Sequence, residues 1–95
     1  MNDNVRLTFN ISDEPILALE INLKTKASKV LEHVDNPVMF HAILQPKEWT
    51  YDGIQSRLQF WFNTQETLPE ILDDIYPDGF YWNGQPNLDL IIEKL

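Results

Sequence analysis

Carboxylates are the side chains whose types and spacing in this sequence come nearest to a chemical site. Asp73, Asp74 and Asp78 lie within one short segment, at a density that can hold a divalent cation. Their spacing does not match a calcium-binding loop, and Tyr76 and Pro77 interrupt the series. We therefore interpret them as a solvated acidic face or as part of a protein contact, and we expect no metal site and no cofactor.

The two histidines, His33 and His41, are the other candidates for chemistry. We expect His33 to end a helix, where an imidazolium would complement the helix dipole. His41 is interpreted as a hydrogen-bonded structural residue within a strand. No serine has the glycine context of a nucleophile elbow, and the three glycines form no phosphate-binding loop. The sequence therefore predicts no catalytic residues and a protein that is not an enzyme.

The net charge of −8, with a pI near 4.4, restricts the partners of the chain. After Arg57 the next base is Lys94, whereas seven acidic residues lie between Glu66 and Glu93. Such a chain is repelled by phosphate backbones, so we expect no direct nucleic-acid binding. An acidic net charge usually serves solubility, but a base-free run of this length also favours a basic protein partner.

The sequence shows no signal for secretion or for membrane insertion. Cysteine is absent, which excludes disulfides and thiolate metal sites. The first residues, MNDNVRLTF, lack the basic and apolar regions of a signal peptide. No apolar run approaches the roughly 18 residues that read as a membrane span. We therefore expect a cytoplasmic protein with no membrane contact.

Aromatic residues accompany the acidic segment, and aromatic side chains are enriched among interface hot spots. Trp82 is also suited to filling the core of a small domain, and Trp61 to a second apolar layer or a dimer seam. For these two tryptophans, packing of this kind and binding to a partner are both kept as interpretations. The predicted partner-binding residues are Glu70, Asp73, Asp74, Tyr76, Asp78, Tyr81, Trp82 and Trp61.

The elements that must position these residues begin with a predicted β-hairpin. Residues 5–11 and 17–24 each alternate apolar and polar side chains, which is typical of a half-buried strand. The polar loop between them is short, so antiparallel pairing is expected. Because each strand is polar on one side, the hairpin should cover the core with one face only.

Two stretches have the apolar spacing of a helix. The stripe in residues 25–34 consists of Ala27, Val30, Leu31 and Val34. Residues 67–76 give a stronger signal, because Thr67 and Glu70 form a capping box at their start. We expect a short helix in each stretch.

The middle of the chain, residues 38–63, is interpreted as a β-hairpin. Its second arm has the clearest strand pattern in the sequence, because Leu58, Phe60 and Phe62 recur on one face at a spacing of two. Asp52-Gly53 is a favoured hairpin turn, so the region is either one long irregular hairpin or three short strands.

The last stretch, residues 88–95, fits both a strand and a helix, and its β-branched pair favours a strand. The resulting order is β-β-α-β-β-α-β. We therefore predict one α+β domain over residues 1–95, with a small, mostly antiparallel sheet of about five strands and two short helices on one face.

The segments VRLTFNISDEPILALEINLKTKASKVLEHV and NLDLIIEKL resemble the two ends of a ubiquitin-like β-grasp domain. The resemblance covers about half of the chain and carries no functional motif. It implies a hairpin that leads directly into a helix, and a final strand that returns beside the first. No diglycine tail follows Leu95, so the resemblance implies no conjugation chemistry.

Three functional hypotheses come from these patterns. The first is a non-enzymatic protein-binding module, an inhibitor or immunity-type protein whose acidic residues steer a basic, nuclease-like partner and whose aromatic residues anchor it. The second is a self-associating structural domain, a homodimer in which the central strands or Trp61 pair across a two-fold axis. The third is a small enzyme or ligand carrier that uses His41 and nearby carboxylates.

Overall fold

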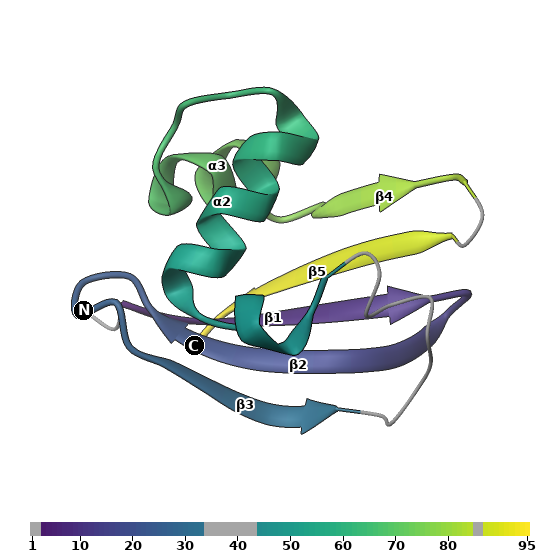
Figure 1. The fold of residues 1–95 in the computed structure, drawn as a ribbon, viewed down its shortest axis with the longest axis horizontal. Coiled ribbons are helices and arrows are strands. Elements are labelled where there is room, and N and C mark those ends of the chain that lie inside the picture. The colour runs from purple at the N-terminus through teal and green to yellow at the C-terminus, as the bar shows by residue number, and fades with distance from the viewer. Residues whose placement is uncertain (1–2, 34–43, 85–86) are drawn as a thin grey trace.

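An antiparallel sheet with two helices over one of its faces forms the body of the computed structural model (Figure 1). The structure describes residues 3–33, 44–84 and 87–95. Within them, five strands form one sheet in the order β3-β2-β1-β5-β4, so the predicted α+β class is confirmed. The strands are β1 (Asn4–Ile11), β2 (Glu14–Asn22), β3 (Ser28–His33), β4 (Phe80–Trp82) and β5 (Leu88–Lys94). The helices are α2 (Tyr51–Phe62), α3 (Leu68–Ile75) and the short 3₁₀ helix η1 (Pro46–Glu48).

The predicted first hairpin is confirmed as β1 and β2. The two strands pair antiparallel with Leu7 opposite Leu19, and the turn between them holds Ser12 and Asp13 at positive φ. β5 pairs antiparallel with the other side of β1, which confirms that residues 88–95 favour a strand. β1 is therefore the central strand of the sheet, between the strand that follows it and the last strand of the chain.

One hydrophobic core lies between the sheet and the two helices. On β1, Val5, Leu7 and Phe9 alternate inward, as the sequence predicts. The apolar sides of both helices pack against this face, so the prediction of two helices on one face is confirmed (Figure 1). The helical contribution to the core is Tyr51, Ile54, Leu58, Leu68, Ile71 and Leu72.

The second arm of the predicted central hairpin is wrong, because residues 51–62 form the helix α2. Tyr51, Ile54 and Leu58 are its buried residues, and their spacing is that of one helical stripe. Phe60 completes the strand-like alternation in the sequence, yet its side chain is 74% exposed. In the sequence the exposed Phe60 stands between the inward-facing Leu58 and Phe62. The three residues therefore have the alternate spacing of a strand, although they belong to a helix.

Both ends of α2 are marked by capping residues. Thr50 Oγ1 accepts a hydrogen bond from the backbone N–H of Gly53 at 3.1 Å. Asn63 ends the helix in the left-handed conformation, with φ of 50°. Asp52-Gly53, predicted as a hairpin turn, lies instead in the first helical turn. A Cβ atom on Gly53 would collide with the backbone carbonyl of Glu48, so the glycine lets α2 pack directly against η1.

The predicted helix over residues 25–34 is also wrong, because this stretch contains the edge strand β3. Asn22 turns the chain, since its Oδ1 accepts from the backbone N–H groups of Lys24 and Thr25 at 2.9 and 2.7 Å. The register then shifts at Leu31, where β3 has one residue more than β2. This bulge breaks the alternation of β3, which explains why its apolar residues have helix-like spacing.

The remaining sequence predictions concern α3, β4, the β-grasp resemblance and the residues that the structure does not describe. The helix predicted for residues 67–76 is confirmed as α3, including its capping box. β4 was not predicted as a strand and pairs with β5 over three residues. The β-grasp resemblance is right about the last strand beside the first and wrong about the helix after the hairpin. Apart from Leu44, the predicted first arm of the central hairpin, residues 38–44, lies outside the described residues, and so does His41.

Candidate functional site

The exposed side of α3 holds the predicted acidic residues. Glu70, in the first turn, accepts hydrogen bonds at its Oε1 from the backbone N–H and the hydroxyl of Thr67, at 3.0 and 2.8 Å. These bonds, the backbone one first, lower the pKa of Glu70. Asp73 and Asp74 are exposed in the last turns, where the helix dipole disfavours negative charge. Asp78 is exposed in the turn that follows.

A fifth carboxylate, Glu66, belongs to this group and was not among the predicted site residues. A side-chain hydrogen bond with Asp74 raises the pKa of the Glu66 carboxyl, and the negative charge of Glu70 acts in the same direction. Glu66 directly precedes Thr67, the N-cap of α3. Its place at the start of the base-free run was the sequence signal that could have included it.

We call Glu66, Glu70, Asp73, Asp74 and Asp78 the acidic face. Lys94 is the cation that the structure brings to it, with Nζ 3.7 Å from Asp73 Oδ1. The same Nζ lies 4.3 Å from the ring centre of Tyr76, the residue that ends α3. Both partners of this ion pair are more than half exposed, so the pair compensates little of the negative charge.

Trp61 lies on α2 and not on the polar face of a strand. Its ring is stacked on Phe80 of β4, with 6.1 Å between ring centres and 17° between ring planes. Phe62 meets the same Phe80 ring edge-on at 4.9 Å. These contacts hold β4 against the end of α2, so Trp61 has a packing role in the described structure.

Tyr81 and Trp82 are adjacent in β4 and therefore lie on opposite faces of the sheet. Tyr81 stands opposite Asp89 and Trp82 opposite the buried Leu88, so Trp82 is on the helical side. Gly84 lies directly against the Trp82 ring, and any side chain at that position would collide with it. The predicted site residues thus do not form one surface: Tyr76 shares Lys94 with Asp73 of the acidic face, Trp61 is packed on Phe80, and Tyr81 and Trp82 lie on opposite faces of the sheet.

Arg57 and Phe60 lie together on the outer side of α2, and the sequence analysis did not predict that they are in contact. The Arg57 guanidinium lies 5.9 Å from the ring centre of Phe60 and 6.0 Å from that of Trp61. Arg57 Nη2 donates to both carboxylate oxygens of Glu48, at 3.0 and 2.8 Å. With position 60 assigned to a strand face, the exposure of Phe60 could not be predicted.

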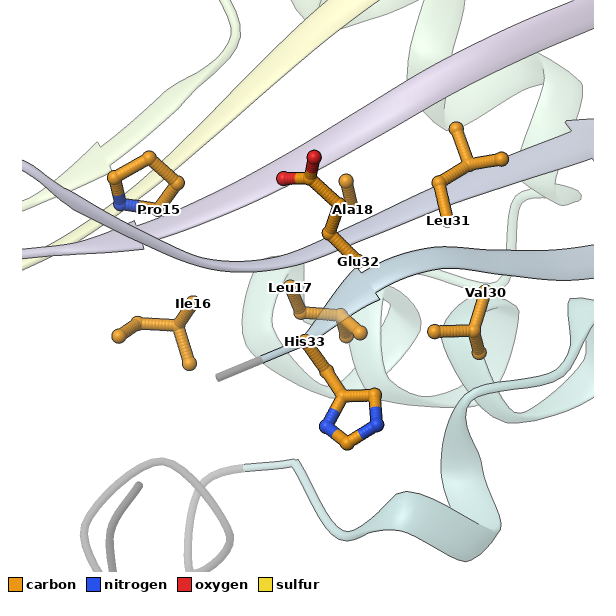
Figure 2. A pocket seen from close by; sticks show the side chains of 8 residues that line it. All are labelled: Pro15, Ile16, Leu17, Ala18, Val30, Leu31, Glu32 and His33. Carbon is orange, nitrogen blue, oxygen red and sulfur yellow. The ribbon is translucent and has the colours of Figure 1, made fainter. Parts of the chain in front are cut away.

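A hollow of about 430 Å³ lies where β2 and β3 run together towards the end of β3 (Figure 2). Its titratable groups are Glu32 and His33, which point to opposite sides of the strand in Figure 2 and so do not converge. His33 is in β3 and not at a helix end, so the predicted capping role is wrong. Its ring faces that of Trp49, with 5.7 Å between centres. Among the lining residues that the structure describes, the hollow offers no paired acid and base.

Among residues 3–33, 44–84 and 87–95, no three His, Asp or Glu side chains are grouped as metal ligands. Over the same described ranges, no helix has both the length and the apolar character needed to cross a bilayer. No protein-family model, curated protein or solved structure matches the chain, so its function must be inferred from this geometry.

Proposed function

We propose that the chain is a small, non-enzymatic protein-binding module whose acidic face docks onto a basic protein. The observation that carries this proposal is the crowding of carboxylates on α3 with one exposed lysine beside them. A side-chain hydrogen bond with Asp74 raises the pKa of Glu66 most, and the negative charge of Asp74 also raises it, so the two carboxylates repel each other when both are ionised. A partner rich in lysine and arginine would relieve this repulsion on binding.

The position of the charges on the helix supports the same proposal. Asp73 and Asp74 lie near the C-terminal end of α3, and no basic residue lies in its last turn. A negative charge in such an exposed position costs roughly 0.3–1 kcal/mol through the helix dipole. Apart from the exposed ion pair of Asp73 with Lys94, the helix gains little from these two charges, whereas an encounter with a basic protein would be accelerated by them.

Steric occlusion is the mechanism that such a face permits. The module would cover a basic site on its partner, as an inhibitor or immunity-type protein covers the positively charged groove of a nuclease. No group on the acidic face needs to react with the partner. The expected kinetic signature is an association rate that falls steeply as salt screens the charges, with a smaller change in the dissociation rate.

The test is a pull-down with the tagged full chain from the source cell, followed by binding kinetics with the protein recovered. Asp73→Asn combined with Asp74→Asn removes two charges from the acidic face. Asp13→Asn combined with Glu14→Gln removes two charges from the β1–β2 turn, where Asn tolerates the positive φ of position 13.

We expect the α3 pair to slow association of a basic protein about tenfold or more at low salt, and the turn pair to change it little. Equal effects of the two pairs would reduce the acidic face to a general contribution to net charge. Recovery of the chain itself alone, with a dimer mass by light scattering, would favour self-association instead.

A further inference from the structure

Phe60 is the most exposed of the large apolar side chains in the described part of the chain, at 74%. It lies on the outer side of α2, while Ile54 and Leu58 of the same helix are buried. The fold makes no use of the Phe60 ring in its core. Aromatic side chains, phenylalanine included, are enriched in the cores of protein interfaces relative to the rest of the surface.

The ring is held by a chain of three contacts. Arg57 lies over it at 5.9 Å, and Arg57 is fixed by two hydrogen bonds to the Glu48 carboxylate. Glu48 Oε1 also accepts from the backbone N–H of Gln45 at 3.1 Å, and this bond, followed by Arg57, lowers the pKa of Glu48. A side chain positioned in advance loses less conformational entropy on binding than a free one.

The last turn of α2, which carries Phe60, lies next to the start of the acidic face. Gln59, the neighbour of Phe60 in the helix, donates from Nε2 to the backbone carbonyl of Glu66 at 2.9 Å. The charge of Arg57 is already paired with Glu48. A surface complementary to this region would offer an apolar pocket with lysine or arginine on its rim.

We infer that Phe60 is the apolar anchor of the interface and inserts into an apolar pocket ringed by basic side chains on the partner protein. This inference rests on the proposed function and adds the residue that provides the affinity. Nucleic acids and anionic membranes are repelled by the net charge of −8. A second copy of the chain would bring two acidic faces together, so it does not fit the same surface.

The first experiment is photo-cross-linking from position 60 of the full chain. Phe60→p-benzoylphenylalanine is irradiated in a lysate of the source cell, and the cross-linked peptide is sequenced by mass spectrometry. Glu14→p-benzoylphenylalanine, in the β1–β2 turn, is the matched control. The expected product is specific to position 60 and contains apolar residues close to lysine or arginine. A peptide from a second copy of the chain, an acidic peptide, or no product above the control would overturn the inference.

The second experiment measures affinity for the purified partner. Phe60→Ala should weaken binding about 30-fold or more, the effect of a hot-spot residue, with the salt dependence unchanged. The Asp73→Asn, Asp74→Asn pair should instead reduce the salt dependence. If the charge pair weakens binding and Phe60→Ala does not, the anchor is wrong and the proposed function stands. If neither variant weakens binding, both are wrong.

Discussion

α2 and α3 cover the same face of the sheet, but they present opposite kinds of surface to solvent. On α2 the one basic residue, the half-buried Arg57, is paired with Glu48, and the ring of Phe60 is left exposed. On α3 the apolar residues are buried and the carboxylates are left with little compensation. Under the proposed function the two helices would have different roles: α3 would supply long-range attraction, and α2 would supply the apolar contact once a partner has arrived.

The largest expected effect tests whether α2 faces the core as described. Leu58→Ala should lower the free energy of unfolding by about 2–5 kcal/mol, because Leu58 is fully buried. Phe60→Ala, two residues further on, should change it by about 0.5 kcal/mol or less, as is usual for exposed positions. Urea denaturation measures both. Large and similar losses of unfolding free energy for the two variants would mean that Leu58 and Phe60 lie on the same buried face. That arrangement is the one expected for the strand that the sequence wrongly predicted.

A smaller effect is expected where α2 begins. Gly53→Ala places a methyl group against the backbone carbonyl of Glu48 and should destabilise the fold by about 1–3 kcal/mol, although alanine has the higher helix propensity. Ser56→Ala, on the exposed side of the same helix, is the control and should be neutral or slightly stabilising. A stabilising Gly53→Ala would show that η1 and α2 are not in direct contact.

The smallest effect concerns the interaction of Glu66 with Asp74. Because Asp74 raises the pKa of Glu66 in the folded chain, folding favours protonated Glu66. The resulting stability is complete below the unfolded pKa and is lost as the pH rises through the folded pKa. Asp74→Asn removes the repulsion, so its melting temperature should exceed that of the original chain slightly at pH 7 and match it near about pH 3. Calorimetry at the two values measures this, and a lower melting temperature at pH 7 would contradict it.

Local signals were sufficient for some elements and misleading for others. β1, β2 and α3 were predictable because alternation or a capping box agreed with the tertiary environment. α2 was not predictable in this way. Phe60 completed an alternation that is typical of a strand, and Asp52-Gly53, a favoured hairpin turn, obscured the capping signal of Thr50. β3 was not predictable either, because its bulge disrupts the alternation and most of its side chains are exposed.

In the candidate site, too, local sequence signals predicted some features and not others. The acidic residues of α3 could be found from the sequence, since charge and a capped helix are local properties. The separation of Tyr81 from Trp82 required β4 to be recognised as a strand. The unit of Glu48, Arg57 and Phe60 required both the helix and its contact with η1, which no local pattern contains.

The position of β1 between β2 and β5 has a kinetic consequence. One neighbour of β1 is available almost at once, whereas the other lies 79 residues away along the chain at the contact of Asn10 with Asp89. Closing so long a loop is entropically costly, and contacts of this range slow folding. During synthesis the β1–β2 hairpin must therefore wait with one edge unpaired until β5 has been made, and in that interval the chain is most open to wrong pairing.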